Sequence, residues 1–266
     1  RRAKELIDSR RTWVNRQCVW MARHTLRAGD VVETRTAAAP PSRKLRILAE
    51  FSRYIVVDKP AGLLSVGAGS VEELLRARTG RPALRCVHRL DRETSGCLLA
   101  ALDHEAFEAA VAVFRTRRVT KFYDVLAAGR MREAVTTIAT PIDGMPARTH
   151  VRRVAANDVA TLLRVRIETG RTHQIRLHLA SIRHPVVGDR LHGLKTGHDP
   201  RLTRVPRQML HAAGLEMDDP LGGGERLRAG SPLPADFRRC LQVFGLEGKR
   251  APRPAARPLA PGGAAV

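Results

Sequence analysis

Five ionisable side chains stand within the nine residues HRLDRETSG, residues 88 to 96, between the apolar runs LRCV and CLLAAL. Asp91 lies near the centre of this stretch. Arg89 stands two positions before it and Arg92 directly after it. A carboxylate can attack an electrophilic carbon, or it can accept a proton from a neighbouring group. In a pocket that excludes water, a carboxylate stays ionised when a cation lies beside it. Asp91 is therefore a candidate for catalysis if the chain supplies such a cation.

Two further motifs could supply partners for Asp91. Arg176, in GRTHQIRLHLA, carries a permanent charge on a planar group that can bind a carboxylate through two hydrogen bonds. Tyr123, in KFYDVLAAG, offers a ring and a hydroxyl to a flat ligand in a chain with only 4% aromatic residues. Taken one by one, each has a plainer interpretation. Asp91 would be a turn residue, Arg176 a surface arginine and Tyr123 a core residue.

Alternating strand and helix patterns must position these side chains. The run YIVVD predicts a strand that ends at KPAG, which places Lys59 at the strand end. TLLRVRIETG alternates apolar and charged residues and predicts a half-buried strand that stops at Gly170. RTHQIRLHLA predicts a helix with Thr172 as its N-cap. DHEAFEAAVAVFRTRRV predicts an amphipathic helix whose apolar positions are Phe107, Ala110, Val111 and Phe114.

Composition divides the chain into four parts. Residues 1–35 start in mid-pattern without Met, and a VNR strand and a GD turn predict a small, partial basic module. Residues 36–45 are rich in Ala and Pro and predict a linker. Residues 46–247 alternate strand and helix patterns as one domain does, and residues 248–266 predict a disordered basic tail.

Charge restricts the class of partner. The chain has 47 Lys and Arg against 26 Asp and Glu, a net charge of +21 that attracts polyanions such as RNA or DNA. It has no apolar run of about 18 residues and no signal-peptide pattern, so we expect a soluble cytoplasmic protein without a membrane partner. The scattered cysteines predict small core residues and no zinc site or disulfide: Cys18, Cys86, Cys97 and Cys240.

Six motifs in order resemble the pseudouridine synthases of the RluA type over about residues 47–240. They are VVDKPAG, HRLDRETSG, KFYDVLAAG, GRTHQIRLHLA, HPVVGD and RQMLHA. The resemblance implies an α+β fold with a mixed, largely antiparallel sheet, flanking helices and a central catalytic cleft. The N-terminal module resembles the end of a small RNA-binding domain of a ribosomal small-subunit protein.

The resemblance also implies an isomerase that detaches uracil from ribose in RNA and rejoins it through carbon 5. Asp91 matches the catalytic aspartate, Arg176 its ion-pairing arginine, Tyr123 the stacking tyrosine and Arg89 the base-displacing arginine. Breaking the glycosidic bond builds positive charge on the sugar, and Asp91 could attack it or take the neighbouring 2′ proton. Such a rearrangement needs no metal or other cofactor.

Further expectations concern the RNA. Lys59 and Arg171 are candidates for phosphate contacts, with simple solvation as the alternative. Ribosomal RNA is the favoured substrate because of the N-terminal module, transfer RNA is the alternative, and the enzyme is expected to act as a monomer.

Two residues depart from the family pattern. Cys97 replaces an aliphatic residue, and Arg183 replaces a glycine, which questions the local turn.

Two other classes of function remain open. A metal-dependent phosphoesterase would use His88, Asp91, His173, His178, His184 and Asp189, although no HExxH or paired-aspartate spacing is present. A non-catalytic RNA-binding or ribosome-assembly protein would explain the charge but would leave Asp91 and Arg176 without a use.

Overall fold

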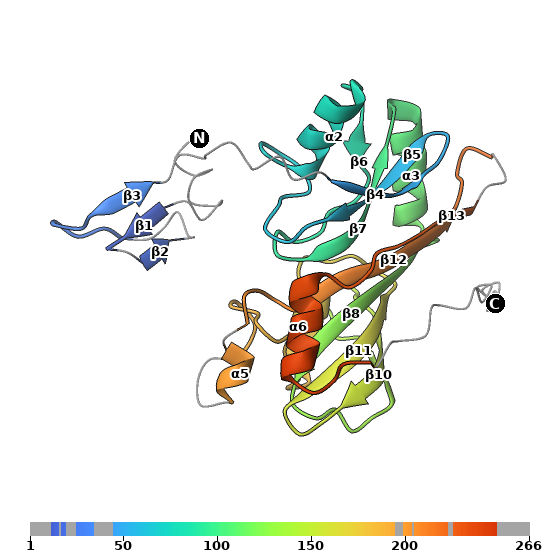
Figure 1. The fold of residues 1–266 in the computed structure, drawn as a ribbon. Helices are drawn as coiled ribbons and strands as arrows, with labels where there is room; N and C mark the ends of the chain where they lie inside the picture. Colours follow the sequence, from blue (N-terminus) through green and yellow to red (C-terminus); the bar gives the residue numbers. More distant parts are fainter. Residues whose placement is uncertain are drawn as a thin grey trace. The chain divides into compact units, whose positions relative to one another are not determined.

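The computed structural model describes residues 12–15, 17–19, 25–34, 45–194, 199–203, 205–222 and 226–248 (Figure 1). The chain forms two compact units, Arg1–Lys44 and Leu45–Val266. Of the linker expected at 36–45, only the last residue is described. Of the tail expected at 248–266, only the first is described.

The first unit contains a small antiparallel sheet. Its strands, in the order β2-β1-β3, are β1 (Thr12–Val14), β2 (Gln17–Val19) and β3 (Val32–Thr34). The expected VNR strand is wrong, because β1 ends at Val14 and Asn15 lies in a turn at φ +50°. Asn15 contacts the expected GD turn: its Nδ2 donates to Asp30 Oδ1 at 2.7 Å, and its Oδ1 accepts from the Val31 amide at 3.0 Å. Gly29 adopts φ +93°, which a glycine tolerates without strain.

The second unit is built on one mixed sheet of ten strands. Eight of them follow the order β4-β5-β7-β12-β8-β11-β10-β9, while β13 pairs with β12 and β6 with β7. Their bounds are β4 (Arg46–Glu50), β5 (Tyr54–Lys59), β6 (Arg85–Cys86), β7 (Ser95–Ala101), β8 (Thr120–Ala128), β9 (Val135–Ile138), β10 (Thr149–Ala156), β11 (Ala160–Ile167), β12 (Leu210–Asp218) and β13 (Arg226–Gly230). The pairing of β7 with β12 is parallel and the other described pairings are antiparallel, which confirms the expected mixed, largely antiparallel sheet.

Helices pack beside this sheet. Figure 1 shows α2 and α3 near β5, β6 and β7, and α6 beside β8 and β11. The described helices are α2 (Val71–Thr79), α3 (His104–Arg115), α4 (Gln174–Ser181), α5 (Pro200–Thr203) and α6 (Ala235–Val243).

Helix α3 forms where the sequence predicts it, but its buried face is rotated. The fully buried residues are Ala106, Ala110 and Val113, whereas the expected Phe107 and Phe114 are only half-buried. Small side chains let a helix approach the sheet closely, and the rings then cover the edges of the contact.

Strand β7 is buried on both faces and forms a rigid centre. Leu98 and Ala100 belong to one hydrophobic cluster, while Leu99 and Ala101 belong to another on the opposite face. Cys97 packs with the second cluster, as a small core residue should. Cys86 and Cys240 are also buried and unpaired, and the side chain of Cys18 lies outside the described residues.

The turn between β11 and α4 differs from the expectation. The helix begins at Gln174, and its N-cap is His173 at φ +54° rather than Thr172. The Gln174 carboxamide oxygen accepts from the Thr169 hydroxyl at 2.7 Å and from the Arg171 amide at 3.1 Å, so it closes the turn in place of a capping hydroxyl. Ile175 is buried on the sheet side of α4, as predicted.

The turn at Arg183 has a backbone conformation that suits the glycine of the family pattern. Arg183 adopts φ +63°, in the left-handed region that favours glycine. Its side chain is exposed, and its amide donates to the Ala180 carbonyl at 3.0 Å. The arginine therefore adopts a backbone conformation that is strained for a residue with a Cβ.

Candidate active site

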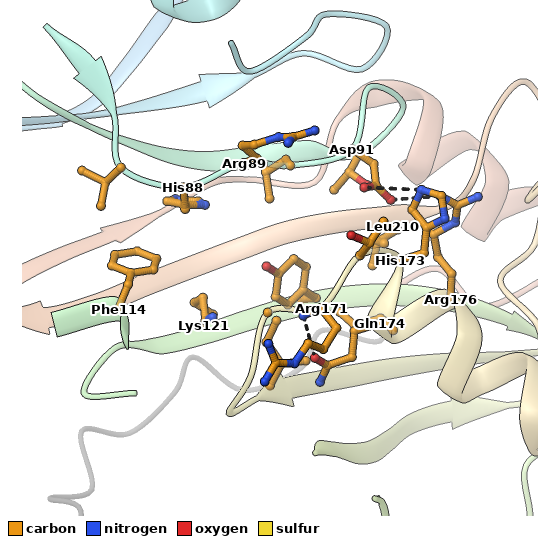
Figure 2. A pocket seen from close by; sticks show the side chains of 18 residues that line it. His88, Arg89, Asp91, Phe114, Lys121, Arg171, His173, Gln174, Arg176 and Leu210 are labelled. Atoms are coloured by element: carbon orange, nitrogen blue, oxygen red, sulfur yellow. Dashed lines mark hydrogen bonds and ion pairs between the residues drawn. The ribbon is translucent and has the colours of Figure 1, made fainter. Parts of the chain in front are cut away.

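A cleft of about 420 Å³ opens in the second unit. One wall is the loop between β6 and β7, residues 87–94, named here the reaction loop. The other walls come from β8 and from the turn that leads into α4 (Figure 2). Five of the six residues expected at the site line it: Arg89, Asp91, Tyr123, Arg171 and Arg176.

Asp91 and Arg176 form the expected ion pair. Arg176 Nη1 donates to Asp91 Oδ2 at 3.0 Å, across 85 positions of sequence. The rest of the guanidinium binds Asp189, with Nε to Oδ2 at 2.6 Å and Nη2 to Oδ1 at 2.8 Å. Arg176 is thus held rigidly by one carboxylate and presents a single edge to the other.

The two carboxylates have different surroundings. The Asp189 side chain is 1% exposed, and the amides of Leu191 and His192 also donate to its Oδ1. Burial acts to raise the pKa of Asp189, but the hydrogen bonds from Arg176 outweigh it and leave this pKa below its usual value. The Asp91 side chain is 30% exposed toward the cleft. Asp189 is thus the closed-off partner of Arg176, and Asp91 is the carboxylate of the pair that a substrate can reach.

Tyr123 combines both roles considered for it. The residue is 8% exposed and belongs to the main hydrophobic cluster, yet its ring also lines the cleft that contains Asp91. Burial raises the pKa of Tyr123 and the charge of Asp91 adds to the shift, so the phenol stays protonated. A fixed ring beside a carboxylate is a suitable support for a planar base.

Arg89 and Arg171 lie at the cleft as cations open to solvent. Arg89 is exposed on the reaction loop, and Arg171 is half-buried, with Nε donating to the Pro146 carbonyl at 3.3 Å. Figure 2 shows both side chains bordering the pocket that holds Asp91 and Arg176. Both positions suit contacts to a nucleic-acid strand that enters the cleft.

Lys59 occupies a different position from the one expected for a phosphate contact. It is fully buried, and its Nζ donates to the carbonyls of Pro60, Leu63 and Arg92 at 3.1, 2.7 and 2.9 Å. Burial lowers the pKa of Lys59 to about 7. With three carbonyl acceptors and no access to solvent, Lys59 supports the reaction loop from behind.

Sequence reasoning assigned no role to several other supports of the reaction loop. Ser65 Oγ donates to the Leu90 carbonyl at 3.0 Å and accepts from the Leu90 amide at 2.9 Å. Gln208 Nε2 donates to Thr94 Oγ1 at 2.8 Å, and Arg207 Nη1 donates to the Glu93 carbonyl at 3.0 Å. Arg207 and Gln208 are the first residues of RQMLHA, so the motif itself was a signal for them.

A buried hydrogen-bond chain joins β7 to β12. Ser95 Oγ lies 3.0 Å from His211 Nδ1, and His211 Nε2 lies 3.2 Å from the Ser231 carbonyl. Burial lowers the pKa of His211 to about 4, so the ring is neutral and joins one donor to one acceptor. At Gly96 an added Cβ would lie 2.2 Å from the Ala212 carbonyl oxygen, so the strands can be this close only with a glycine.

The histidines that motivated a metal-dependent reaction are dispersed among structural contacts. His178 Nδ1 lies 2.8 Å from Thr149 Oγ1, and His88 Nε2 accepts from the Leu99 amide. His173 Nδ1 lies 3.0 Å from His192 Nε2, and the His173 Nε2 lies 3.9 Å from Asp91. Among the described residues, no three His, Cys, Asp or Glu side chains are placed to hold a metal ion.

Comparison with known proteins places this geometry in a family. Residues 53–181 match the model of the RNA pseudouridylate synthase family. The chain is 36% identical to the ribosomal large subunit pseudouridine synthase D of Xanthomonas campestris, over 88% of this chain and 82% of that protein. The protein of the same name from Haemophilus ducreyi is 31% identical, over 94% and 87% of the two chains.

Solved structures agree. Human RNA pseudouridylate synthase domain containing 1 has a TM-score of 0.62 and 26% identity, over 83% of this chain and all of that one. Human RNA pseudouridylate synthase domain containing 4 shares the fold, with a TM-score of 0.64 and 24% identity, over 77% of this chain and 95% of that one. The fold is therefore that of an isomerase that modifies RNA. The chain belongs to the RNA pseudouridylate synthase family, as the resemblance to RluA-type enzymes implied.

No helix in the described part of the chain is long and apolar enough to cross a membrane.

Proposed function

We propose that this enzyme converts specific uridines of ribosomal RNA to pseudouridine with Asp91 as its catalytic carboxylate. The observation that carries the proposal is the chain of contacts from Asp189 through Arg176 to Asp91. It holds a reachable carboxylate in a defined orientation inside a cleft, and Asp189 already neutralises the arginine.

The proposed reaction starts with the target uracil against Tyr123 and its sugar beside Asp91. As the bond between N1 and C1′ breaks, the sugar gains positive charge that the carboxylate stabilises. Asp91 either bonds to C1′ or removes the 2′ proton. The uracil then turns, C5 bonds to C1′, the C5 proton leaves to solvent, and N1 gains a proton. Atoms and electrons balance without an oxidant, a reductant or a second substrate.

Arg89 and Arg171 are proposed to bind the RNA strand. A stacked base must leave its helix to reach Asp91, and unstacking costs about a few kcal/mol. Arg89 is exposed on the reaction loop two positions before Asp91, so its side chain is placed to fill the position that the base vacates. Arg171 carries its charge at the opposite border of the cleft, where a phosphate of the same strand would pass.

Ribosomal RNA is the proposed substrate because of the names of the relatives. Proteins that this chain matches over most of their length bear the name ribosomal large subunit pseudouridine synthase D. Transfer RNA remains the alternative. The enzyme is further proposed to act as a monomer in the cytoplasm, with a cleft built from residues of its second unit. Sedimentation of the purified protein, alone and with RNA, tests the monomer.

Pseudouridine mapping in cellular RNA, with and without the gene for this protein, tests the function. We expect one or a few ribosomal sites to disappear and to return when the parent protein is supplied, but not when Asp91→Asn is supplied. Loss of sites in transfer RNA would redirect the substrate. Retention of every site would favour the non-catalytic RNA-binding alternative.

A further inference from the structure

The cleft has two ends with different chemistry. Figure 2 shows Asp91, His173 and Arg176 gathered at one end, and His88, Phe114 and Lys121 at the other. The second end is named here the Lys121 subsite and is lined by Val87, His88, Phe114, Lys121 and Gly170. The steps proposed above use the first end and leave the second without a role.

Lys121 is a cation in this subsite that contacts an aromatic ring but has no anionic or hydrogen-bonding partner among the described residues. Across the part of the chain that the structure describes, its Nζ makes no hydrogen bond or ion pair, and it lies over the Phe114 ring in a cation–π contact, 5.6 Å from the centroid. Burial lowers the pKa of Lys121 to about 8, so the amine is still mostly protonated at neutral pH. The side chain is half-buried and lines the cleft, so its charge faces the space that a substrate would fill.

Other buried cations of this unit have partners. Lys59 donates to three carbonyls, and Arg164 Nε donates to Asp124 Oδ1 at 2.7 Å. An unpaired charge removed from water is unfavourable, so one that lies in a binding cleft suggests that its partner arrives with the ligand. Lys121 therefore identifies a position for a negatively charged or strongly hydrogen-bonding group.

The surroundings of Lys121 select a singly charged group. His88 stacks on Phe114 with centroids 5.1 Å apart, and its Nε2 accepts from the Leu99 amide. Burial, and then the charge of Lys121, lowers the pKa of His88 to about 3, so this ring is neutral. Lys121 is therefore the single charged group among the five lining residues, and one phosphodiester group matches its charge.

The spacing along β8 relates this subsite to the target base. Lys121 and Tyr123 are two residues apart on one strand, so they face the same side about 6.7 Å apart along it. At Gly170 an added Cβ would lie 3.7 Å from Lys121 Nζ, so this residue borders the ammonium group. A base on Tyr123 thus places a neighbouring phosphate of its own strand within reach of Lys121.

We propose that Lys121 binds the phosphodiester group adjacent to the target uridine inside the cleft, and so determines which nucleotide of the displaced strand reaches Asp91. The inference rests on the proposed function. It adds a binding site beyond the catalytic group, and it places one backbone contact inside the cleft, unlike Arg89 and Arg171 at its border.

RNA in which one phosphodiester is replaced by an uncharged linkage tests the contact of Lys121 with the RNA backbone. Substrate RNAs are made with one methylphosphonate linkage, either 5′ or 3′ of the target uridine. The parent enzyme, Lys121→Met, Lys121→Arg and Arg115→Met are compared for affinity and for single-turnover rate. Arg115 is exposed on α3 and does not line the cleft, so its variant loses one charge elsewhere.

Lys121→Met is expected to weaken binding of ordinary RNA by about 10- to 100-fold, the range of one charge-assisted hydrogen bond. Lys121→Arg should recover most of this affinity. On one of the two methylphosphonate RNAs, the parent enzyme and Lys121→Met should bind with the same affinity. The slope of log affinity against log salt should fall by about 0.7 in Lys121→Met.

Two outcomes overturn the inference. The first is an equal decrease in affinity by Lys121→Met on all three RNAs, which would indicate a contact to the uracil oxygens or to a distant phosphate. The second is no decrease on any RNA. Arg115→Met should lower the affinity for all three RNAs slightly and by the same factor. Binding is measured independently of turnover, so an enzyme that makes no pseudouridine contradicts the proposed function without deciding this contact.

Discussion

Arg176 touches two carboxylates, and the difference in their burial separates their roles. Asp189 is closed off from solvent and bound through both oxygens, whereas Asp91 is reached from the cleft and bound through one. Without Asp189, the Arg176 guanidinium would attract Asp91 more strongly, and the Asp91 carboxylate would be less available to react with a sugar. The second carboxylate therefore makes Arg176 an orienting group as well as a counter-charge.

Asp91→Asn should abolish chemistry and preserve binding. The amide keeps the size of the side chain but can neither attack C1′ nor accept the 2′ proton, so tritium release from uridine labelled at carbon 5 should fall below detection. RNA affinity should stay equal or rise because one negative charge is removed. The fold should persist because Arg176 keeps Asp189. Tritium release near the parent rate from a folded, RNA-binding variant would remove Asp91 from the mechanism.

Asp189→Asn should lower both stability and turnover. It leaves the buried Arg176 with only Asp91, and breaking a buried pair costs roughly 3–5 kcal/mol. Arg176 should then draw Asp91 toward itself, so kcat should fall more than KM changes. Asp124→Asn is the matched control, since it breaks the Arg164 pair on the other face of β8, away from the cleft. We expect melting temperature to fall in both variants and kcat to fall only in Asp189→Asn; equal decreases in kcat would contradict this.

Strand β7 and the segments beside it hold the reaction loop in place. The backbone of the loop is held by Ser65 at Leu90, by Lys59 at Arg92 and by Arg207 at Glu93. These supports come from the region after β5, from the end of β5 and from the segment before β12. A loop bound at so many points keeps its geometry before substrate arrives, as electrostatic catalysis requires.

The buried hydrogen-bond chain through His211, between β7 and β12, should make the stability of the fold depend on pH. His211 has a folded pKa of about 4, below the usual value of about 6.5, so the unfolded chain binds more protons between these values. Stability is therefore complete above pH 6.5 and falls as pH decreases toward 4. His88, with a pKa of about 3, contributes in the same direction over a wider range.

His211→Gln tests this by removing the titration of His211. The free energy of unfolding, measured by urea titration from pH 7 to 4.5, should decrease less steeply in the variant, by about 1.4 kcal/mol per pH unit at most. The variant itself should be less stable at pH 7, because it disturbs the contacts to Ser95 and Ser231. An unchanged pH slope would show that the protonation of His211 does not limit the fold.

Periodicity predicts elements well and side-chain partners poorly. The strand at 160–167 and the helix at 104–115 appear where alternation and helical spacing place them. The pairing of Asp91 with Arg176 followed from chemical need and the family resemblance. Lys59 was misjudged because a lysine at a strand end is usually solvated, and only three-dimensional packing reveals the carbonyls around it. The support that Asp189 gives to Arg176 was missed because the two residues lie on different elements, so no local pattern marks the pair.

Positive charge is distributed over both units of the chain. The first unit, residues 1–44, has eleven Lys and Arg against four Asp and Glu, about a third of the net excess of +21. The cleft and the catalytic candidates lie entirely in the second unit. Binding strength and chemistry should therefore be separable by removing the first unit.

Removal of residues 1–44 should weaken RNA binding far more than it slows the chemical step. With fewer cations the protein displaces fewer counterions, so the slope of log affinity against log salt should become smaller by about 0.7 for each phosphate that the first unit had neutralised on single-stranded segments. The rate at saturating RNA in a single turnover should stay close to that of the full chain, because Asp91, Arg176 and their supports are intact. Filter binding over a tenfold range of salt measures the first quantity, and tritium release at saturation measures the second. If the saturated rate collapses while the shortened chain stays folded, residues of the first unit take part in the reaction, and the division between binding and chemistry is wrong.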